Sequence, residues 1–288
     1  MRFRFGVLAV FILQLNAGSS AGAEKFDRNP IPGGVTAGAS GDIVEATLIG
    51  RTTRYRHFVL GTPYEAAGLR VKTANGRLLE IMLPEDSVFE DRQPRIADLD
   101  NDGRNEIVLV LSRLSMGSAL VILGLRDEAL KILAESTPNG APQRWLNPAG
   151  IGNFLNNGRR QVALVRMPHI VGRLEFWDYD GSKLTLHGAI ENTSNHRAGS
   201  NQMNLSAVIP RKNTQADLLA VPDFNRRNLR IIAAQPTPHQ VATFHLNGTV
   251  VGDLRVSRVA KGQTVRVPLA DGAFREILLS QEFLAQQF

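Results

Sequence analysis

The stretch IADLDNDGRNEIVLV, residues 96–110, is repeated in outline by IGNFLNNGRRQVALV, residues 151–165. The two stretches align without a gap at a spacing of 55, so that Gly103 falls on Gly158. A third copy, SAVIPRKNTQADLLAVPD at residues 206–223, follows with its apolar pair at a further spacing of 56. A period of this length is typical of a protein built from copies of one supersecondary unit.

Short apolar runs separated by turn residues fill the chain beyond residue 40. The dipeptides Asn75-Gly76 and Asp180-Gly181 each stand between two such runs and are strong hairpin signals. Residues 126–136 have some helical character, but they occupy a strand position in the repeat and are expected to be a strand. Four strands in every 50 to 56 residues predict an all-β fold of the β-propeller type, whereas a β-sandwich would show no such period.

Five four-stranded blades follow from the period, with four or six blades as alternatives. The expected blade ranges within one domain, residues 41–288, are 42–84, 94–136, 147–190, 203–246 and 250–281. The first blade includes an expected strand at residues 55–61. Because the last range has room for only three strands, residues 29–38 of the N-terminal segment 24–40 are expected to supply its missing outer strand and close the ring.

The N-terminus has the features of a secretory signal. Arg2 and Arg4 precede the apolar run GVLAVFILQL, which is too short to span a bilayer of about 30 Å as a helix. The small residues Ala21-Gly22-Ala23 form a cleavage site. We therefore expect a signal peptide over residues 1–23, cleavage after Ala23, export to the periplasm or cell exterior, and no membrane span in the mature chain.

The composition limits both the interactions that can stabilise the mature protein and the partners that can bind it. The chain has no cysteine, so an exported form must be held by its own core or by bound ions. Cleavage would remove two arginines and leave 31 basic against 27 acidic residues, a net charge of +4 instead of +6. The basic residues are scattered and no basic stretch is interleaved with aromatic residues, which argues against a nucleic-acid partner.

Asp98, Asp100 and Asp102 alternate ahead of Gly103, as in a calcium-binding loop. An EF-hand would carry a bidentate Glu at its twelfth position, which here is Leu109, and would be flanked by helices. The flanks of this loop are expected strands, so an EF-hand is excluded.

The same residues resemble an FG-GAP (VCBS-type) repeat, the blade unit of integrin α-subunit propellers and of many bacterial secreted proteins. The resemblance is specific at residues 96–110, fair in the next copy, and visible over residues 85–222. It implies a metal held between the first two strands of a blade. The implied ligands are the side chains of Asp98, Asp100, Asp102 and Glu106 and the backbone carbonyl of Arg104.

An oxygen set of this kind suits Ca²⁺. The family usually has Asp where this chain has Glu106, which is one methylene longer. The alternative is a polar turn that binds no ion. The next copy has Asn153, Leu155, Asn157 and Gln161 at the four side-chain positions, so a single structural calcium site is expected.

A functional face is expected at the opposite end, because binding residues concentrate on loops held by a rigid scaffold. Trp145 would offer a stacking surface, and His196 would donate a hydrogen bond with a charge that responds to mild acid. The alternative is that Trp145 packs between blades. The candidate ligand-binding residues are Arg144, Trp145, Asn147, His169, His196 and Asn201.

The expected function is a non-enzymatic binding or interaction module for a glycan or protein partner. No G-x-S-x-G, H-E-x-x-H or P-loop motif is present, so no catalytic residue is assigned. One alternative is a propeller hydrolase acting on a glycan or phosphoester, with His169 and His196 as acid–base groups or with paired carboxylates among Glu85, Asp86 and Glu90. The other is a degenerate scaffold protein.

Overall fold

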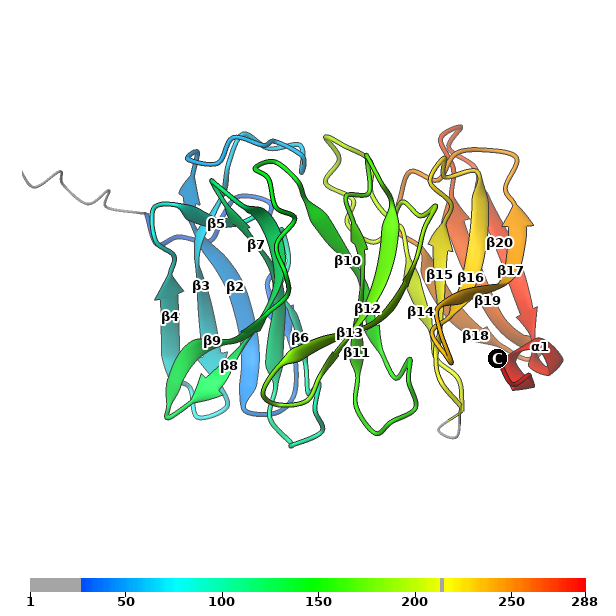
Figure 1. Ribbon diagram of the computed structural model, residues 1–288, viewed down its shortest axis with the longest axis horizontal. Coiled ribbons are helices and arrows are strands. Elements are labelled where there is room, and N and C mark those ends of the chain that lie inside the picture. The colour runs from blue at the N-terminus through cyan, green and yellow to red at the C-terminus, as the bar shows by residue number, and fades with distance from the viewer. Residues whose placement is uncertain (1–26, 213–214) are drawn as a thin grey trace, which may run out of the picture.

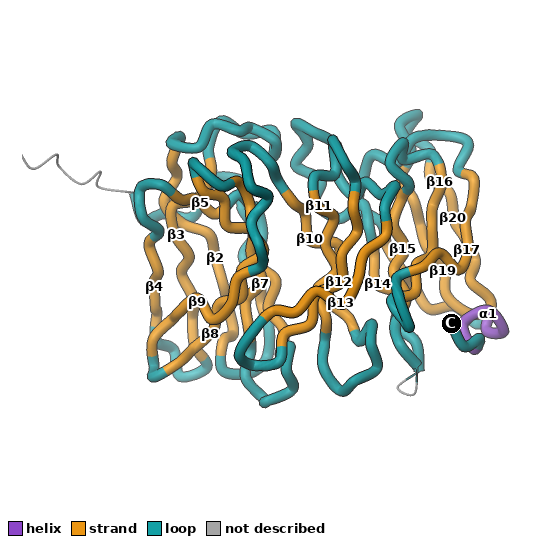
Figure 2. Tube along the Cα trace, in the orientation of Figure 1, coloured by secondary structure: helices purple, strands orange, loops and turns teal. Residues whose placement is uncertain are grey.

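The computed structural model describes residues 27–212 and 215–288, so the expected signal peptide at residues 1–23 lies outside the described residues. The described chain is all-β, with four antiparallel sheets and one five-residue helix, α1 (Gln281–Ala285) (Figures 1 and 2). The prediction of an all-β fold is therefore confirmed.

The strands form five groups in chain order (Figure 1). The first group holds β1 (Ala37–Gly38), β2 (Ile43–Thr52), β3 (Glu65–Thr73) and β4 (Leu78–Met82), and the second holds β6 (Arg95–Ala97), β7 (Glu106–Arg113), β8 (Gly117–Arg126) and β9 (Ala129–Glu135). The third holds β10 (Leu146–Gly152), β11 (Gln161–Arg166), β12 (Arg173–Tyr179) and β13 (Leu184–Ile190). The fourth holds β14 (Ala207–Ile209), β15 (Leu218–Pro222), β16 (Asn228–Ala233) and β17 (His239–His245), and the fifth holds β18 (Arg255–Val259), β19 (Gly262–Pro268) and β20 (Phe274–Ser280).

The grouping of the strands follows the period of the sequence. The segment with helical character, residues 126–136, forms the strand β9 as predicted, and the fifth group has the three strands expected of it. The short strand β5 (Ser87–Phe89) lies between the first two groups and pairs with both β3 and β7. It joins these groups into one nine-stranded sheet.

The hydrophobic core is divided among the four junctions between consecutive groups. β7 and β8 are continuous apolar runs because both faces of the second group are covered by neighbours. In the described residues none of these clusters joins the fifth group to the first, and Figure 1 shows these two groups at opposite ends of the molecule. Representative members across the four junctions are Leu69 with Leu109, Val110 with Leu164, Phe176 with Leu219, and Ile231 with Val265.

The outward faces of the first and fifth groups mix charged residues with exposed apolar ones, such as Leu78 in the first group and Leu278 in the fifth. In β3, Arg70 Nε donates to Glu80 Oε1 at 2.7 Å on the side away from the second group. In β19, the exposed Arg266 alternates with the buried Val265 and Val267. The charged residues on these faces favour solubility of an array of packed units.

The N-terminal segment pairs with the first group and not with the last. β1 is antiparallel to β2, and Pro30 forms a bridge with Ile49. The Ile31 N–H donates to the Leu48 carbonyl at 3.1 Å. The expectation that residues 29–38 complete the last blade was therefore wrong. Pairing with β2 closes a much shorter loop and so costs less chain entropy.

A loop replaces one expected strand of the first group. Residues 53–64 connect β2 to β3, and they include the predicted strand at residues 55–61. Arg56 and Phe58 have φ values of +55° and +57°, and this left-handed conformation cannot continue a strand. The place of that strand in the group is taken by β1.

Ile31→Ala is expected to lower the free energy of unfolding by about 2 kcal/mol, because it leaves a cavity where the segment packs on the first group. The Ile31 side chain is 4% exposed and belongs to the cluster between the first two groups. Urea denaturation followed by circular dichroism measures the change. Val35→Ala, at a position that is 51% exposed, is the matched control and should change stability by less than about 0.5 kcal/mol. Equal effects of the two substitutions would contradict the packing described for this segment.

Candidate functional site

The antiparallel strand order places two sets of loops at opposite ends of the molecule (Figure 1). The loop after the first strand of a group lies at one end, and the loops after its second and fourth strands lie at the other. The acidic loop, residues 98–106, follows the first strand of the second group. The loops that carry the candidate ligand-binding histidines lie at the other end, as predicted.

The acidic loop brings three carboxylates together. Oxygen atoms of Asp98, Asp100 and Glu106 lie within 4.8 Å of one another. Glu106 begins β7 and is completely buried, whereas Asp98 and Asp100 are half-buried. Asp102 is exposed and lies outside this group of three. The structure therefore brings together three of the four side chains that the sequence predicted as ligands.

Side-chain to backbone hydrogen bonds shape the loop. The Gly103 N–H donates to Asp98 Oδ2 at 3.0 Å, and the Asp102 N–H donates to Asp100 Oδ1 at 3.2 Å. Asp102 Oδ1 accepts from the Arg104 N–H at 2.8 Å. Gly103 has a φ of +86°, which a residue with a side chain rarely adopts. These bonds aim the carboxylates of Asp98 and Asp100 toward Glu106.

The three carboxylates are short of partners that would stabilise negative charge. Glu106 Oε2 accepts from the Leu99 N–H at 3.0 Å, but the buried oxygens Glu106 Oε1 and Asp98 Oδ1 have no hydrogen-bond partner. Burial, followed by the charges of Asp100 and Asp102, raises the pKa of Glu106 to about 7. A hard cation would satisfy the unpartnered oxygens and relieve the repulsion, so the residues present fit such an ion.

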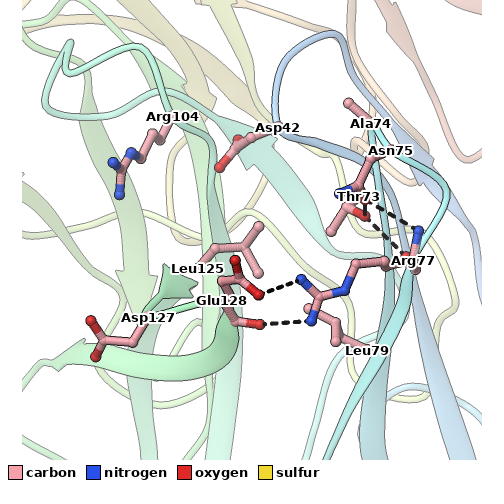
Figure 3. Close-up of a pocket in the computed structure, with 10 residues that line it drawn as sticks. All are labelled: Asp42, Thr73, Ala74, Asn75, Arg77, Leu79, Arg104, Leu125, Asp127 and Glu128. Carbon is pink, nitrogen blue, oxygen red and sulfur yellow. Dashed lines mark hydrogen bonds and ion pairs between the residues drawn. The ribbon is translucent and has the colours of Figure 1, made fainter.

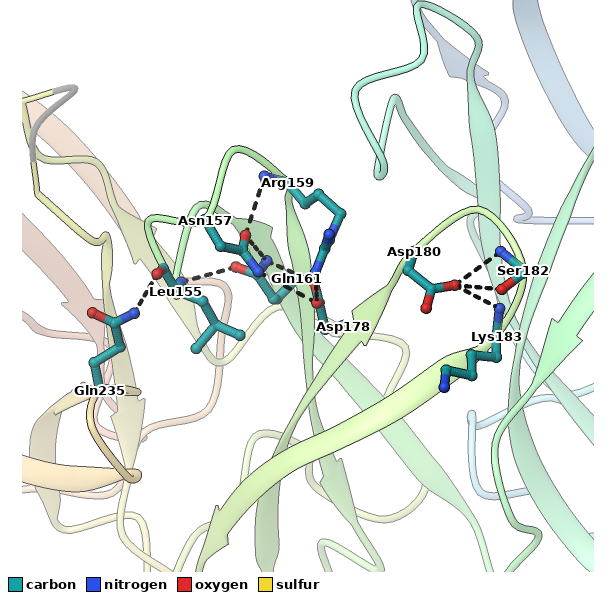
Figure 4. A network of polar contacts seen from close by, with 9 residues as sticks. All are labelled: Leu155, Asn157, Arg159, Gln161, Asp178, Asp180, Ser182, Lys183 and Gln235. Atoms are coloured by element: carbon teal, nitrogen blue, oxygen red, sulfur yellow. Dashed lines mark hydrogen bonds and ion pairs between the residues drawn. The ribbon is translucent and has the colours of Figure 1, made fainter.

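The equivalent loop of the third group is held by protein groups alone (Figure 4). Gln161, at the position of Glu106, accepts from the Leu155 N–H through Oε1 at 2.9 Å. Its Nε2 donates to Asn157 Oδ1 at 2.9 Å and to Asp178 Oδ1 at 2.8 Å. Arg159 is paired with the same Asp178 carboxylate. In the third group an amide and a guanidinium thus contact the Asp178 carboxylate directly, whereas in the acidic loop the Arg126 guanidinium lies 3.9 Å from Glu106 Oε1.

A groove of about 340 Å³ lies beside the acidic loop, between the first and second groups (Figure 3). It carries charges of both signs, including Asp42 and Arg104. Arg77 Nη1 pairs with Glu128 Oε2 at 3.0 Å across it and ties the β3–β4 hairpin to the β8–β9 hairpin. Because this ion pair spans the groove, the groove is better explained as a contact between the two groups than as a ligand site.

At the other end, three of the predicted ligand-binding residues meet. His169 stacks on Trp145 with ring centroids 6.0 Å apart and planes at 15°, and His196 approaches Trp145 edge-on at 4.7 Å. His169 Nε2 lies 3.1 Å from His196 Nδ1, and His196 Nε2 lies 3.0 Å from the Ser200 carbonyl. Together with His57, described below, these three residues are called the histidine cluster.

The roles predicted for Trp145 and His196 were wrong. Trp145 is 2% exposed and packs at the junction of the second and third groups, so its ring offers no free stacking surface. Its Nε1 donates to the Glu90 carbonyl at 3.0 Å. Burial, with His169 as the next cause, lowers the pKa of His196 to about 3, so its charge does not respond to mild acid.

The other predicted ligand-binding residues are spread apart. Asn147 is completely buried, and its Nδ2 donates to the Met203 carbonyl at 2.8 Å. Asn201 is exposed, and its Oδ1 accepts from Gln202 Nε2 at 3.3 Å. Arg144 is half-buried. Asn147 therefore ties β10 to the segment between β13 and β14 and is not available to a ligand.

Sequence reasoning missed the role of His57. Its Nδ1 lies 2.6 Å from Glu90 Oε1. Glu90 is 1% exposed, and its Oε2 accepts from Ser112 Oγ at 2.6 Å. His57 and Glu90 are 33 positions apart, so no local motif marks the pair.

A pocket of about 300 Å³ opens between the loops that carry His57, Trp145 and His169. Three residues of its wall, Phe58, Gln143 and Met167, have φ values of +57°, +56° and +48°. Backbone strain of this kind persists only where the surrounding structure enforces it, and it concentrates at functional sites. Asp127 and Glu128 in the groove beside the acidic loop also have positive φ values. The pocket is the stronger candidate because His57 and His169 line it together with exposed apolar residues.

Glu65→Gln is expected to make the slope of stability against pH less negative between pH 4.5 and about 7. Burial, followed by the charge of Glu90, raises the pKa of Glu65 to about 7, and Glu65 Oε2 has no hydrogen-bond partner. Between its ordinary pKa of 4.5 and about 7 the folded state keeps a proton that the unfolded state has released. The free energy of unfolding therefore falls as the pH rises through this window.

Glu106 contributes with the same sign, whereas His169 and His196, whose pKa values are lowered to about 4 and about 3, contribute with the opposite sign below pH 6.5. Glu65→Gln therefore removes one contribution from a slope of mixed origin. Urea denaturation in chelator at pH 5, 6, 7 and 8 measures the slope. Glu85→Gln, at an exposed position, is the control and should keep the slope of the unsubstituted protein. A Glu65→Gln slope equal to that control would contradict the prediction.

A scan against protein-family models found no matching family, and a search of curated proteins found no similar sequence. Within residues 27–212 and 215–288, the only helix is far shorter than a membrane-crossing segment, and no candidate span is found.

Proposed function

We propose that this protein is an exported, non-enzymatic binding module made of five propeller-type blades, with one structural calcium loop. The period of the sequence, the up-and-down strand order of each group and the FG-GAP-like residues of the acidic loop support the blade assignment. The N-terminal sequence supports export to the periplasm or cell exterior. The observation that carries the binding function is the strained, histidine-lined pocket at the loop end of the molecule.

In this proposal the calcium ion is bound by Asp98, Asp100 and Glu106, whose oxygens already converge. The Asp102 side chain and the Arg104 carbonyl, implied by the FG-GAP resemblance, would complete the oxygen set. The acidic loop and the pocket lie at opposite ends of the molecule. The ion therefore stabilises the second group and takes no part in ligand binding.

Glycan and peptide arrays probed with the full chain test the binding function. The expected result is binding to a restricted set of probes, weakened at least tenfold by His57→Ala. His245→Ala, on the exposed end of β17, is the matched control and should bind as the unsubstituted protein does. Failure to bind any probe, or binding that His57→Ala leaves unchanged, would overturn the assignment of the pocket.

The His57–Glu90 pair favours a second candidate function, a hydrolase acting on a glycan or phosphoester. A carboxylate that holds one nitrogen of an imidazole leaves the other nitrogen able to act as a general base. Chromogenic glycosides and phosphoesters test this alternative. Turnover that His57→Ala abolishes would favour the hydrolase, and the absence of turnover with bound probes would favour the binding module.

A further inference from the structure

We infer that the pocket at the histidine cluster accepts an uncharged saccharide, whose hydroxyl groups donate hydrogen bonds to Nε2 of His57 and Nδ1 of His169. This inference rests on the proposed binding function and specifies its ligand class. It follows from the positions of the protons on the histidines, from the charges behind the pocket and from the apolar residues at its rim.

The proton positions on His169 and His196 follow from their hydrogen bonds. The Ser200 carbonyl can only accept, so Nε2 of His196 carries a proton. In a neutral His196 the Nδ1 atom is then an acceptor, and Nε2 of His169 must be the donor to it. A neutral His169 therefore presents an unprotonated Nδ1. Burial, with the charge of Arg226 as the next cause, lowers the pKa of His169 to about 4, so the neutral form persists at neutral pH.

The proton position on His57 follows in the same way. An ionised Glu90 can only accept hydrogen bonds: Oε2 accepts from Ser112 Oγ, and Oε1, which lies 2.6 Å from Nδ1 of His57, accepts from that nitrogen. His57 therefore carries a proton on Nδ1, and a neutral His57 presents a lone pair on Nε2. The side chain of His57 is 19% exposed and lines the same pocket as His169.

A pocket with two acceptor nitrogens selects a ligand that donates. A phosphate or carboxylate would meet lone pairs at both nitrogens and is disfavoured. Arg226 and Arg197 place positive charge near His196, and the Glu90 carboxylate places negative charge beside His57, so neither sign of ligand charge is favoured. A neutral ligand with several hydroxyl groups satisfies both conditions.

The rim of the pocket suits the apolar face of a sugar ring. Phe58 is 47% exposed and Ile170 is 55% exposed, and both line the pocket. Its volume of about 300 Å³ is at the lower end of the usual range for small-molecule sites, about 300–1,000 Å³, which favours a single ring over an extended chain. Apolar walls with a few convergent polar groups are typical of such sites.

Long-range ¹H–¹⁵N NMR of the ¹⁵N-histidine-labelled full chain tests the inference in two steps. The free protein should show unprotonated Nε2 at His57 and Nδ1 at His169. Titration with glucose, galactose, mannose, N-acetylglucosamine and their disaccharides should then shift these two resonances and leave those of His239 and His245 unchanged. His57→Ala and His169→Ala should each weaken saccharide binding about tenfold, as expected for one lost hydrogen bond, whereas His245→Ala should not.

Protonated nitrogens at these two positions would overturn the inference without any variant having to fold. So would a panel in which no neutral saccharide binds, or in which glucuronate or a primary amine, added as charged comparison probes, binds and the neutral saccharides do not. If a peptide binds instead, and His57→Ala weakens it, the saccharide class is wrong and the binding module stands. If neither the saccharides nor any array probe binds, both the saccharide inference and the proposed binding function are wrong.

Discussion

Trp145→Ala is expected to lower the free energy of unfolding by about 3–5 kcal/mol. The indole is 2% exposed and belongs to the cluster between the second and third groups. Its removal leaves a cavity at that junction, takes the stacking partner from His169 and leaves the Glu90 carbonyl without its donor. Denaturation followed by the fluorescence of the remaining Trp177 measures the loss.

Trp145→Phe separates packing from hydrogen bonding. Phenylalanine retains an aromatic ring at the junction but cannot donate to the Glu90 carbonyl, so a smaller loss of about 1–3 kcal/mol is expected. If Trp145→Ala costs less than about 1 kcal/mol, the indole is not part of the core. The role as a stacking surface, one of the two considered from the sequence, would then return.

Calcium at a hundredfold excess over its Kd is expected to raise the free energy of unfolding by about 2.7 kcal/mol, because the ion binds only the folded acidic loop. For a protein of this size that corresponds to a rise in Tm of about 5–10 °C. Melting curves in chelator and in millimolar calcium measure the difference. The difference should grow from pH 6 to pH 8, because the pKa of Glu106 is raised to about 7 and calcium must displace its proton.

Asp100→Asn should remove the difference between the two melting curves, because it takes one charge from the three converging carboxylates. Asp178→Asn is the matched control in the third group, where Gln161 and Arg159 already supply the partners. It should lower Tm equally in chelator and in calcium. Identical melting points of the unsubstituted protein in chelator and in calcium would show that the acidic loop is a polar turn that binds no ion.

Most of the fold could be predicted because each group repeats the same pattern of buried apolar strands separated by polar turns. The spacing of 55 residues located the later groups to within a few residues, and it identified β9 against its local helical pattern. The prediction failed where the chain leaves the repeat. Val59 and Leu60 are apolar because they are buried in a loop, and an apolar run indicates burial without indicating conformation. Residues 29–38 pair with β2, the nearest strand edge along the chain. The prediction considered only the number of strands in the last group and not the distance along the chain.

The two candidate sites differed in how visible they were. The acidic loop lies within nine consecutive residues, so its carboxylates form a local pattern that the sequence displays. The histidine cluster combines loops from three groups, and only their position in the repeat pointed to Trp145, His169 and His196. The orientation of each ring depends on hydrogen bonds to Glu90 and Ser200, which no spacing encodes.

β5 has a consequence for how the molecule comes apart. β5 forms a three-residue ladder with β7 and a single pair, Phe89 with Ala66, with β3, and so makes the first two groups one sheet. The later junctions depend mainly on side-chain packing, with an isolated bridge between Thr193 and Asp223 at the junction of the third and fourth groups. Amide protons of β3 and β7 should therefore exchange with solvent together, in one large opening event, while the later groups exchange in separate and smaller ones. Under mechanical load the chain would then yield in four steps instead of five, with the longest release of length from its N-terminal portion.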